Sequence, residues 1–534
     1  MTTRLYRVSV MAAVVIGTLL ALRSAPFLKD DAYIFLRYAD NLASGRGPVF
    51  NPGGEIVEGF SSPMWLGMVT GLRLMVGRQG LETATSTLGL AVFILSMLAI
   101  SRLSRLPQEG DDDTGFLYFM RLVPPLFLAC LPTTASYMLS GLEPFLLLFA
   151  VLLFTGVADD AVPLAVGGVV GLLAMWIRPE GMWFSISYAA ALIGRGEGRR
   201  LVSGRSLFLF GALAAGTVIL TGLRYSIFGL PLPNTYYAKA PSLAAGLLYV
   251  GSTLTTPWGA SILVLGLLGA GFGCRRHLGY LAAGLSWLVA AIVEGGDWMG
   301  SGRFLLPANA FFLLAVPGLA GVTESSFFEK IGFPRRWRLC GVLALLLPAL
   351  ALSGRAAWEA GNLARNNARY VSRSNAILAK WLTEARIRSL GTVDIGQIGF
   401  KSDLDIVDFG GLTDRTLARV SGAHLKKRID LDYVLTARSP EVIAIRIQRP
   451  PTVHPNGSME IDPTSAATLV EGEIWLSPLF RENYSLLFVN VPNRRMTPFY
   501  AQVFYLKRGI RIDAALMPTR KIIYHDWAAA TDDD

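Results

Sequence analysis

Two neighbouring aspartates, Asp30 and Asp31, follow the first apolar segment of the chain, in the stretch KDDAYIFLRYADNLASGRGPVFNPGGEIVEGFSSP. Ionisable groups so close to a membrane segment are costly to keep, which favours a functional role. A carboxylate can take the proton of a reacting hydroxyl, and two side by side can share a proton or hold a divalent cation. The residues alone do not decide between a general base, a pair that shares a proton and a cation site. A solvated loop without a chemical role is a further alternative.

Further polar motifs stand at the ends of apolar segments, namely SGLEP, RPEG, LPNTYYAKA and EGGDWMGSGRF. Their cations could hold a phosphate through charge-assisted hydrogen bonds, and we assign this role to Arg178, Lys239, Arg303 and Arg37. Their acidic, amide and aromatic side chains could bind a polar substrate, and the candidates are Glu58, Glu143, Glu180, Asn234, Tyr237, Asp297 and Trp298. Structural roles are the alternative: an ion pair for RPEG, a turn for GGDW, an aromatic membrane anchor for LPNTYYAKA, and pairing with Asp40 for Arg37.

The composition predicts that membrane helices position these motifs. Of the 534 residues, 52% are hydrophobic and 16% charged, whereas a soluble protein carries roughly 25% charged residues. Basic residues beside membrane spans explain the net charge of +10, so we expect no nucleic-acid partner. The three cysteines lie in or beside apolar runs without a CxxC motif, and the four histidines are scattered. These patterns argue against a disulfide framework and a zinc site.

Hydropathy and the positive-inside rule predict about eleven transmembrane helices, with the N-terminus in the cytoplasm. Arg23 stands next to the only conceivable cleavage site, so we expect an uncleaved first span rather than a signal peptide. The predicted spans are 8–25, 84–101, 122–139, 144–158, 161–177, 181–194, 205–223, 257–273, 278–293, 304–321 and 338–353. All the motifs above then lie on the outer side.

The region between the first two spans is the first outside loop, residues 26–83. Its apolar run 63–77 is predicted to lie in the membrane interface or to dip partway into the membrane, because a crossing there would leave Arg102 and Arg105 outside. Residues 1–353 form the predicted transmembrane module. After them the pattern changes to helical periodicity and then to short β-like runs such as LGTVDI and YSLLFVNV, which predict an extracytoplasmic α/β domain over 354–534.

The stretch DDAYIFLRYADNLASGRGPVFNPGGEIVEGFSSPMW resembles the first outside loop of bacterial GT-C glycosyltransferases. Within them it is most similar to the group of the mycobacterial terminal β-(1→2)-arabinofuranosyltransferase. SGLEP, RPEG, PNTYYAK, GGDWM and GLTD resemble further signatures of the wider family, in the same order along the chain. The text after VEGFSSP departs from the arabinosyl enzyme, and the C-terminal domain is smaller, so the sugar remains open.

The resemblance implies a GT-C-like enzyme of the bacterial plasma membrane that uses a polyprenyl-phosphate sugar donor. The sugar, with arabinofuranose as one candidate, would pass to a cell-envelope glycan or glycolipid on the outer face. Asp30 or Asp31 would be the general base, and we expect inversion by a single displacement. A requirement for a divalent cation, held by the same two aspartates, stays open. Tyr236 or Tyr237 and Trp298 could stack on sugar rings, and the C-terminal domain could bind the acceptor.

Two other classes of protein share parts of this pattern. A transporter or flippase of a lipid-linked sugar would have the same polytopic build and cationic mouth, but it should show repeat symmetry and helices broken at the membrane midplane. The chain has no evident internal repeat. A sensor or scaffold would not need so many acidic and basic residues at the outer ends of its spans. The sequence therefore favours a membrane glycosyltransferase.

Overall fold

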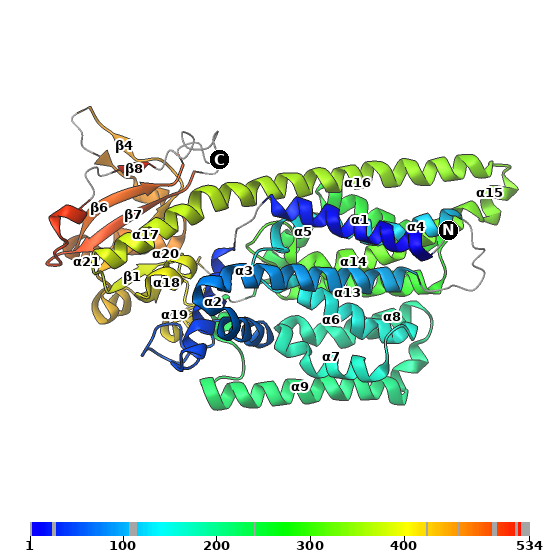
Figure 1. The fold of residues 1–534 in the computed structure, drawn as a ribbon, viewed down its shortest axis with the longest axis horizontal. Coiled ribbons are helices and arrows are strands. Elements are labelled where there is room, and N and C mark those ends of the chain that lie inside the picture. The colour runs from blue at the N-terminus through cyan, green and yellow to red at the C-terminus, as the bar shows by residue number, and fades with distance from the viewer. Residues whose placement is uncertain are drawn as a thin grey trace.

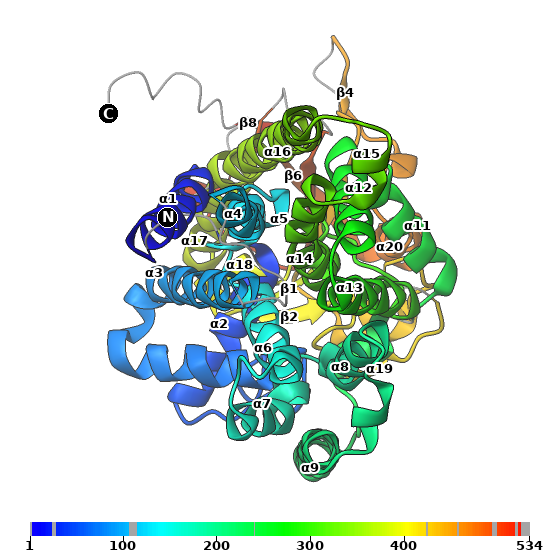
Figure 2. The same ribbon diagram turned by 90° about the vertical axis from the view of Figure 1, so that its right-hand side faces the viewer.

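The computed structural model describes residues 3–23, 28–105, 115–239, 241–422, 425–455, 459–493, 499–517 and 522–524. Figure 1 shows a long bundle of helices with a strand-containing part at one end. Figure 2 views the bundle along its length, so that α4, α9 and α16 are seen end-on. The acidic run 111–113, predicted to be a solvated loop, lies outside the described residues.

The helices of the bundle follow the predicted spans in order. They are α1 (Thr3–Leu22), α3 (Pro63–Ser104), α4 (Gly115–Ala129), α5 (Pro132–Tyr137), α6 (Pro144–Gly156), α7 (Leu164–Ile177), α8 (Trp183–Gly194), α9 (Gly204–Phe228), α11 (Leu243–Leu254), α12 (Pro257–Phe272), α13 (Arg275–Val293), α14 (Leu306–Ala315), α15 (Ser326–Lys330) and α16 (Arg335–Asn366). Each predicted span overlaps one or more of these helices.

Fewer helices than predicted are long and apolar enough to cross a membrane on their own. Within the described residues there are five: Pro63–Ser104, Gly204–Phe228, Arg275–Val293, Arg303–Lys330 and Arg335–Glu384. The pair α11 and α12, bent by 86°, makes a sixth if it is counted as one span. Other predicted spans coincide with shorter apolar helices such as α6 and α7, of 13 and 14 residues, whereas an upright crossing needs about 20.

Helix α3 combines the predicted interfacial helix with the span that follows it. The two halves meet at Gly77, whose φ of 74° and ψ of 178° interrupt the helix and suit glycine, which lacks a Cβ. Just before this kink, Leu74 and Met75 are 68% and 81% exposed. An apolar tip of this kind fits contact with the membrane surface.

The strand-containing part is built around a six-stranded mixed sheet with the order β2-β1-β3-β7-β6-β8. Its strands are β1 (Ser389–Thr392), β2 (Asp405–Asp408), β3 (Val442–Ile447), β6 (Tyr484–Val491), β7 (Ala501–Lys507) and β8 (Ile522–Tyr524). Strand β1 runs parallel to β2 and β3, and β7 runs antiparallel to β3 and β6. Strands β4 (Thr452–Val453) and β5 (Met459–Glu460) form a separate pair.

The central strand β3 explains how this part joins the bundle. Successive side chains of a strand point to opposite faces, and in β3 both faces are buried. Val442 and Ala444 belong to the same hydrophobic core as the bundle helices, with α17 (Arg373–Glu384) and α18 (Gly396–Ser402). Ile443 and Ile445 pack into a second core with α20 (Leu469–Leu476) and α21 (Pro478–Asn483).

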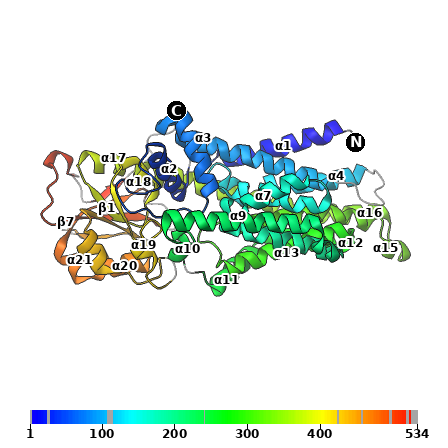
Figure 3. The same ribbon diagram turned by 90° about the horizontal axis from the view of Figure 1, so that it is seen from below.

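Two connections join this part to one end of the helix bundle. Helix α16 passes through a π-helical turn, Asn367–Ser372, directly into α17, so the predicted boundary at residue 353 falls inside one continuous helix. On the opposite side, α10 (Asn234–Lys239) lies beside α19 (Arg415–Ala418), as Figure 3 shows from below. Helix α2 (Asp30–Ala43) packs against α18 between these two connections.

Candidate active site

The two aspartates form the first turn of α2, a helix that is buried over most of its length. Its start is fixed by the SGLEP loop, because the Lys29 backbone N–H donates to the Ser140 carbonyl at 3.0 Å. Gly141 has a φ of 78°, and a Cβ there would stand 2.6 Å from the Leu28 side chain. Glycine is therefore required for the loop to lie against the start of α2.

Asp31 lines a narrow pocket of about 40 Å³, to which residues 59–61 and the motifs SGLEP, RPEG, LPNTYYAKA and EGGDWMGSGRF also contribute. The charged and polar side chains that line it are Asp31, Ser61, Glu143, Arg178, Thr235, Lys239 and Arg303. Leu412, in the GLTD segment of the C-terminal part, closes one side. The structure thus brings together segments that lie far apart in the sequence, such as α2 and the loop at Leu412.

The Asp31 carboxylate has no hydrogen-bond or ion-pair partner among the described residues. Its surroundings are cationic nevertheless. Burial raises the pKa of Asp31, and the charges of Lys239 and Arg303 oppose this rise. Asp31 is therefore a buried acidic group whose oxygens are not used by any hydrogen bond or ion pair within the described residues.

Two lysines lie close to Asp31. Lys239, at the end of α10, forms no ion pair with any described residue, and burial lowers its pKa while the Asp31 charge opposes the shift. Lys29 stands 4.1 Å from the centre of the Tyr137 ring, and burial lowers its pKa to about 8. Neither Lys29 nor Tyr137 was among the predicted site residues, although Lys29 directly precedes the two aspartates in the sequence.

Arg303 borders the pocket from the GGDWMGSGRF loop. Its Nε donates to the Asp297 carboxylate at 2.8 Å, and both side chains are buried. The loop is held by α5, because the Tyr137 hydroxyl donates to the Gly300 carbonyl at 2.8 Å and Thr133 donates to the Ser301 carbonyl at 2.5 Å. Arg303 therefore keeps a fixed position, with part of its charge shared with Asp297.

Arg178 lines the same pocket and lies in a cluster of ion pairs. Its guanidinium donates to Glu180 at 2.9 and 2.6 Å and pairs also with Glu143, and all three side chains are buried. These carboxylates use three of the five guanidinium N–H groups of Arg178. Arg178, Glu143 and Glu180 thus form a buried ion-pair cluster at the pocket wall, and their contacts with phosphate or substrate stay predictions.

Glu58 and Asn234, predicted to bind substrate, instead join parts of the structure. Arg224 of α9 donates through Nε to both carboxylate oxygens of Glu58, at 3.0 and 2.9 Å, and this pair is buried. The Asn234 side chain donates to the carbonyls of Gly411 and Leu412 at 2.9 and 3.0 Å. Arg224 fixes the first loop, and Asn234 fixes the GLTD segment of the C-terminal part.

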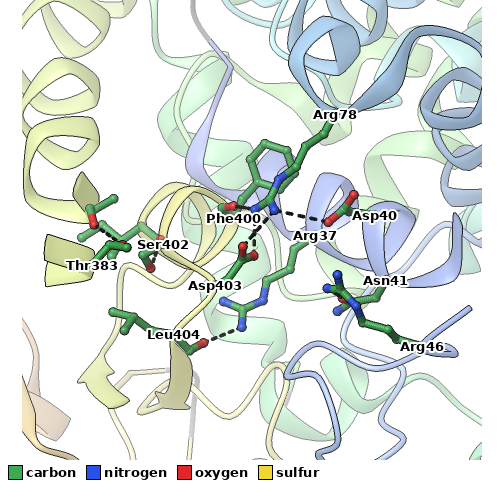
Figure 4. Close-up of polar contacts among 12 residues, drawn as sticks. Arg37, Asp40, Asn41, Arg46, Arg78, Thr383, Phe400, Ser402, Asp403 and Leu404 are labelled. Carbon is green, nitrogen blue, oxygen red and sulfur yellow. Dashed lines mark hydrogen bonds and ion pairs between the residues drawn. The ribbon is translucent and has the colours of Figure 1, made fainter. Parts of the chain in front are cut away.

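Arg37 also lies in a structural junction rather than in the pocket. Its guanidinium donates to the carbonyls of Phe50 at 2.7 Å and Leu404 at 2.5 Å. Asp40 does not pair with it but with Arg73, at 2.6 Å. Figure 4 shows this junction, where Arg78 of α3 bridges Asp40 and Asp403. The predicted phosphate contact of Arg37 is therefore not supported.

Asp30 faces away from the pocket lining and holds α18. The backbone N–H groups of Gly396 and Gln397 donate to its two carboxylate oxygens at 2.9 and 2.8 Å. Burial and the negative charge of Asp394 raise the pKa of Asp30 to about 7. The described residues contain no group of three or more His, Cys, Asp or Glu side chains arranged to hold a metal ion.

A larger cavity of about 750 Å³ adjoins the pocket on the far side of Asp297. Trp298, predicted to bind substrate, lines it and is 66% exposed. Tyr237, the other predicted aromatic residue, is partly buried and packs edge-to-face against Tyr236 at a centroid distance of 5.8 Å. It is not among the residues that line either space.

Comparisons with known proteins establish the fold. Residues 362–503 match the model of a domain of unknown function, DUF8728. No curated protein matches the chain. Two crystal structures of ArnT from Cupriavidus metallidurans are similar to it: the complex with undecaprenyl phosphate, with a TM-score of 0.52, and the apo state, with a TM-score of 0.54. Each alignment has 12% sequence identity and covers 94% of this chain and 98% of ArnT.

This likeness confirms the predicted GT-C-like fold, because it extends over nearly the whole of both chains. Together with the long apolar helices, it identifies the chain as a membrane protein.

Proposed function

We propose that the protein is a membrane glycosyltransferase that moves a sugar from a polyprenyl-phosphate donor to a cell-envelope glycan. The observation that carries this proposal is the Asp31 carboxylate, which has no partner among the described residues and shares one pocket with Lys239 and Arg303. A base and phosphate-binding cations in one pocket are the groups that such a transfer needs. The donor class is supported by the fold, since the similar ArnT was crystallised with undecaprenyl phosphate.

In the proposed reaction, Asp31 takes the proton of an acceptor hydroxyl while the hydroxyl oxygen attacks the anomeric carbon of the donor sugar. The bond from that carbon to the phosphate oxygen breaks, and polyprenyl phosphate leaves. Lys239, Arg303 and Lys29 stabilise the negative charge that develops on the phosphate. One displacement of this kind inverts the anomeric configuration. Burial of Asp31 supports its role, because a raised pKa makes a carboxylate a stronger base.

The resemblance of the first outside loop, residues 26–83, to that of the arabinosyl enzyme favours arabinofuranose as the sugar. We place the reaction on the outer face of the bacterial plasma membrane. The donor's lipid tail would remain in the bilayer, while its phosphate meets the cations at the outer ends of the helices. The helical part before Gly77, with its apolar tip, would lie in the interface and border the path of the donor.

The test uses the full chain in lipid nanodiscs, supplied with radiolabelled polyprenyl-phosphoryl sugars, arabinofuranose first, and a glycan fraction of the cell envelope. We expect Asp31→Asn to lower transfer by about 10²–10⁴-fold, because the acceptor loses its general base. It should still bind undecaprenyl phosphate. Asp160→Asn is the matched control, since Asp160 is a 64% exposed carboxylate that pairs with Arg205 outside the pocket.

Equal transfer by the wild type and Asp31→Asn would contradict the assignment of the base. Movement of a lipid-linked sugar across a sealed vesicle without any transfer to glycan would instead favour the transporter alternative.

A further inference from the structure

The larger cavity next to the pocket is formed where α16 leaves its apolar stretch. It lies between α5, the bend from α11 to α12, the GGDWMGSGRF loop and residues 352–360 of α16. Helix α16 packs against both α5 and α12, and Figure 2 shows the three close together. From Arg355 onward α16 carries charged side chains, and Arg355 pairs with Glu359 at 2.9 Å on the cavity rim. The cavity is therefore at the polar border of the bundle.

The side chains that line this cavity are of three kinds. Three are large aromatic groups, Tyr249, Trp258 and Trp298. Seven carry hydroxyl groups or charges, namely Ser252, Thr253, Thr256, Ser301, Asp297, Arg355 and Glu359, and most of the rest are glycine, alanine and proline. Long aliphatic side chains are few, with Met299 and Leu352 among the lining residues. A polyprenyl chain would need a continuous apolar groove, whereas aromatic faces beside hydrogen-bonding groups suit a carbohydrate.

One ion pair separates the cavity from the pocket of Asp31. Asp297 lines the cavity, and its partner Arg303, at 2.8 Å, lines the pocket. The loop that carries both residues has positive φ angles at Gly295, Gly296, Ser301 and Gly302. For Ser301, with a φ of 67°, this conformation is strained. A ligand in the cavity would thus meet the same loop that positions Arg303 beside the proposed base.

We infer that this cavity binds the carbohydrate acceptor and delivers its hydroxyl group to Asp31 past the Asp297–Arg303 pair. That the bound carbohydrate is the acceptor rests on the proposed glycosyl transfer. That the cavity binds a carbohydrate rests on the side chains that line it. Trp298 contributes a sugar-stacking surface at the mouth. Its large exposed fraction means that its replacement removes this surface without opening a hole in the core.

A binding test that needs no transfer places benzoylphenylalanine at position 298 of the full chain in nanodiscs. The protein is irradiated in the presence of a lipid-free glycan fraction of the cell envelope or of undecaprenyl phosphate. The mass of the peptide that contains position 298 is then measured by mass spectrometry. We expect adducts that carry pentose or hexose units with the glycan and none with undecaprenyl phosphate. Polyprenyl adducts, or the absence of any sugar-bearing adduct, would overturn the inference. A sugar adduct in a protein without transfer activity would support the carbohydrate site and count against the proposed function alone.

A kinetic test follows where transfer is measured. Trp298→Ala should raise the KM for the glycan acceptor about tenfold and leave the KM for the donor unchanged, because one stacking contact is lost. Trp298→Phe should restore most of the loss. Trp337→Ala is the matched control, since Trp337 is a 55% exposed tryptophan at the far end of α16. An unchanged acceptor KM, or a rise in the donor KM instead, would overturn the inference.

Discussion

Asp30 and Asp31 are adjacent in the chain, yet their carboxylates serve different parts of the molecule. Asp30 accepts two backbone hydrogen bonds from the start of α18, whereas Asp31 lines the pocket without a partner among the described residues. One turn of α2 therefore joins the C-terminal part to the proposed catalytic group. The sequence leaves either aspartate open as the base, and this arrangement supports our proposal of Asp31.

Asp30→Asn should weaken the attachment of α18. An asparagine offers one acceptor oxygen in place of two, so one of the two backbone N–H groups would lose its partner, at a cost of about 1–3 kcal/mol. We expect faster hydrogen exchange in residues 396–402, measured by mass spectrometry, and a smaller loss of transfer than with Asp31→Asn. Asp31→Asn is the control and should leave exchange in α18 unchanged. Equal exchange in Asp30→Asn and the wild type would refute this role.

The same residue predicts how stability depends on pH. Burial and the nearby Asp394 raise the pKa of Asp30 to about 7, against about 3.9 in an unfolded chain. Between these values the folded state holds a proton that the unfolded state has released, so the free energy of unfolding falls as pH rises from about 4 to about 7. Thermal unfolding in detergent at several pH values should show a smaller decrease for Asp30→Asn than for the wild type. Parallel curves would argue against the prediction.

Gly396→Ala tests how closely α2 and α18 approach. A Cβ at position 396 would stand 1.9 Å from the Asp30 carbonyl oxygen, a distance that neither backbone can accept without moving. We expect a loss of about 1–3 kcal/mol or more, as in other overpacked sites, together with faster proteolysis of the C-terminal part. Gly354→Ala in α16 is the matched control, because a Cβ there meets nothing within 4 Å. The idea fails if both variants melt at the same temperature.

Glu58→Gln should destabilise the protein strongly although it lies in a loop. The substitution leaves the buried Arg224 without its carboxylate, and breaking a buried ion pair in this way costs about 3–5 kcal/mol. Glu55→Gln is the control, because Glu55 is 50% exposed and pairs with Arg415 near the surface, where ion pairs contribute at most about 1 kcal/mol. Thermal unfolding of the two variants in detergent checks the difference. Similar midpoints would show that the Glu58–Arg224 pair is not important for stability.

The positions of the helices, and the approach of the polar motifs to one another, can be predicted from the apolar runs in the sequence. Apolar runs mark helices, and their alternation across a membrane puts every second loop on one side. The segments around Asp31, Glu143, Lys239 and Arg303 could therefore be expected to approach each other. The structure places all four residues at one pocket.

The partners of the buried charges could not be predicted in the same way. Arg178 pairs with a glutamate 35 positions away, Arg224 with one 166 positions away, and Asn234 donates to a carbonyl 177 positions away. A single sequence shows that a charge stands near a membrane but not whether a substrate or another side chain neutralises it. For this reason the sequence alone did not show that these three side chains have partners within the protein.

Lys239 gives the most direct test of donor binding. It borders the pocket beside Asp31, and no described residue neutralises it by an ion pair. Its charge is therefore available to the donor phosphate. Lys239→Met removes the charge but keeps an apolar stem of similar length. The lost charge-assisted hydrogen bond corresponds to about 1.5–3 kcal/mol, or roughly 10–100-fold in affinity.

We expect Lys239→Met to raise the donor KM and the Kd for undecaprenyl phosphate by this factor, measured in nanodiscs. The KM for the glycan acceptor should change little, because Lys239 does not line the acceptor cavity. Lys380→Met is the matched control, since Lys380 is 78% exposed on α17 and pairs only with Glu384 among the described residues. If both variants bind undecaprenyl phosphate like the wild type, the donor phosphate does not lie beside Lys239. The cations of the pocket would then be needed only to keep Asp31 ionised.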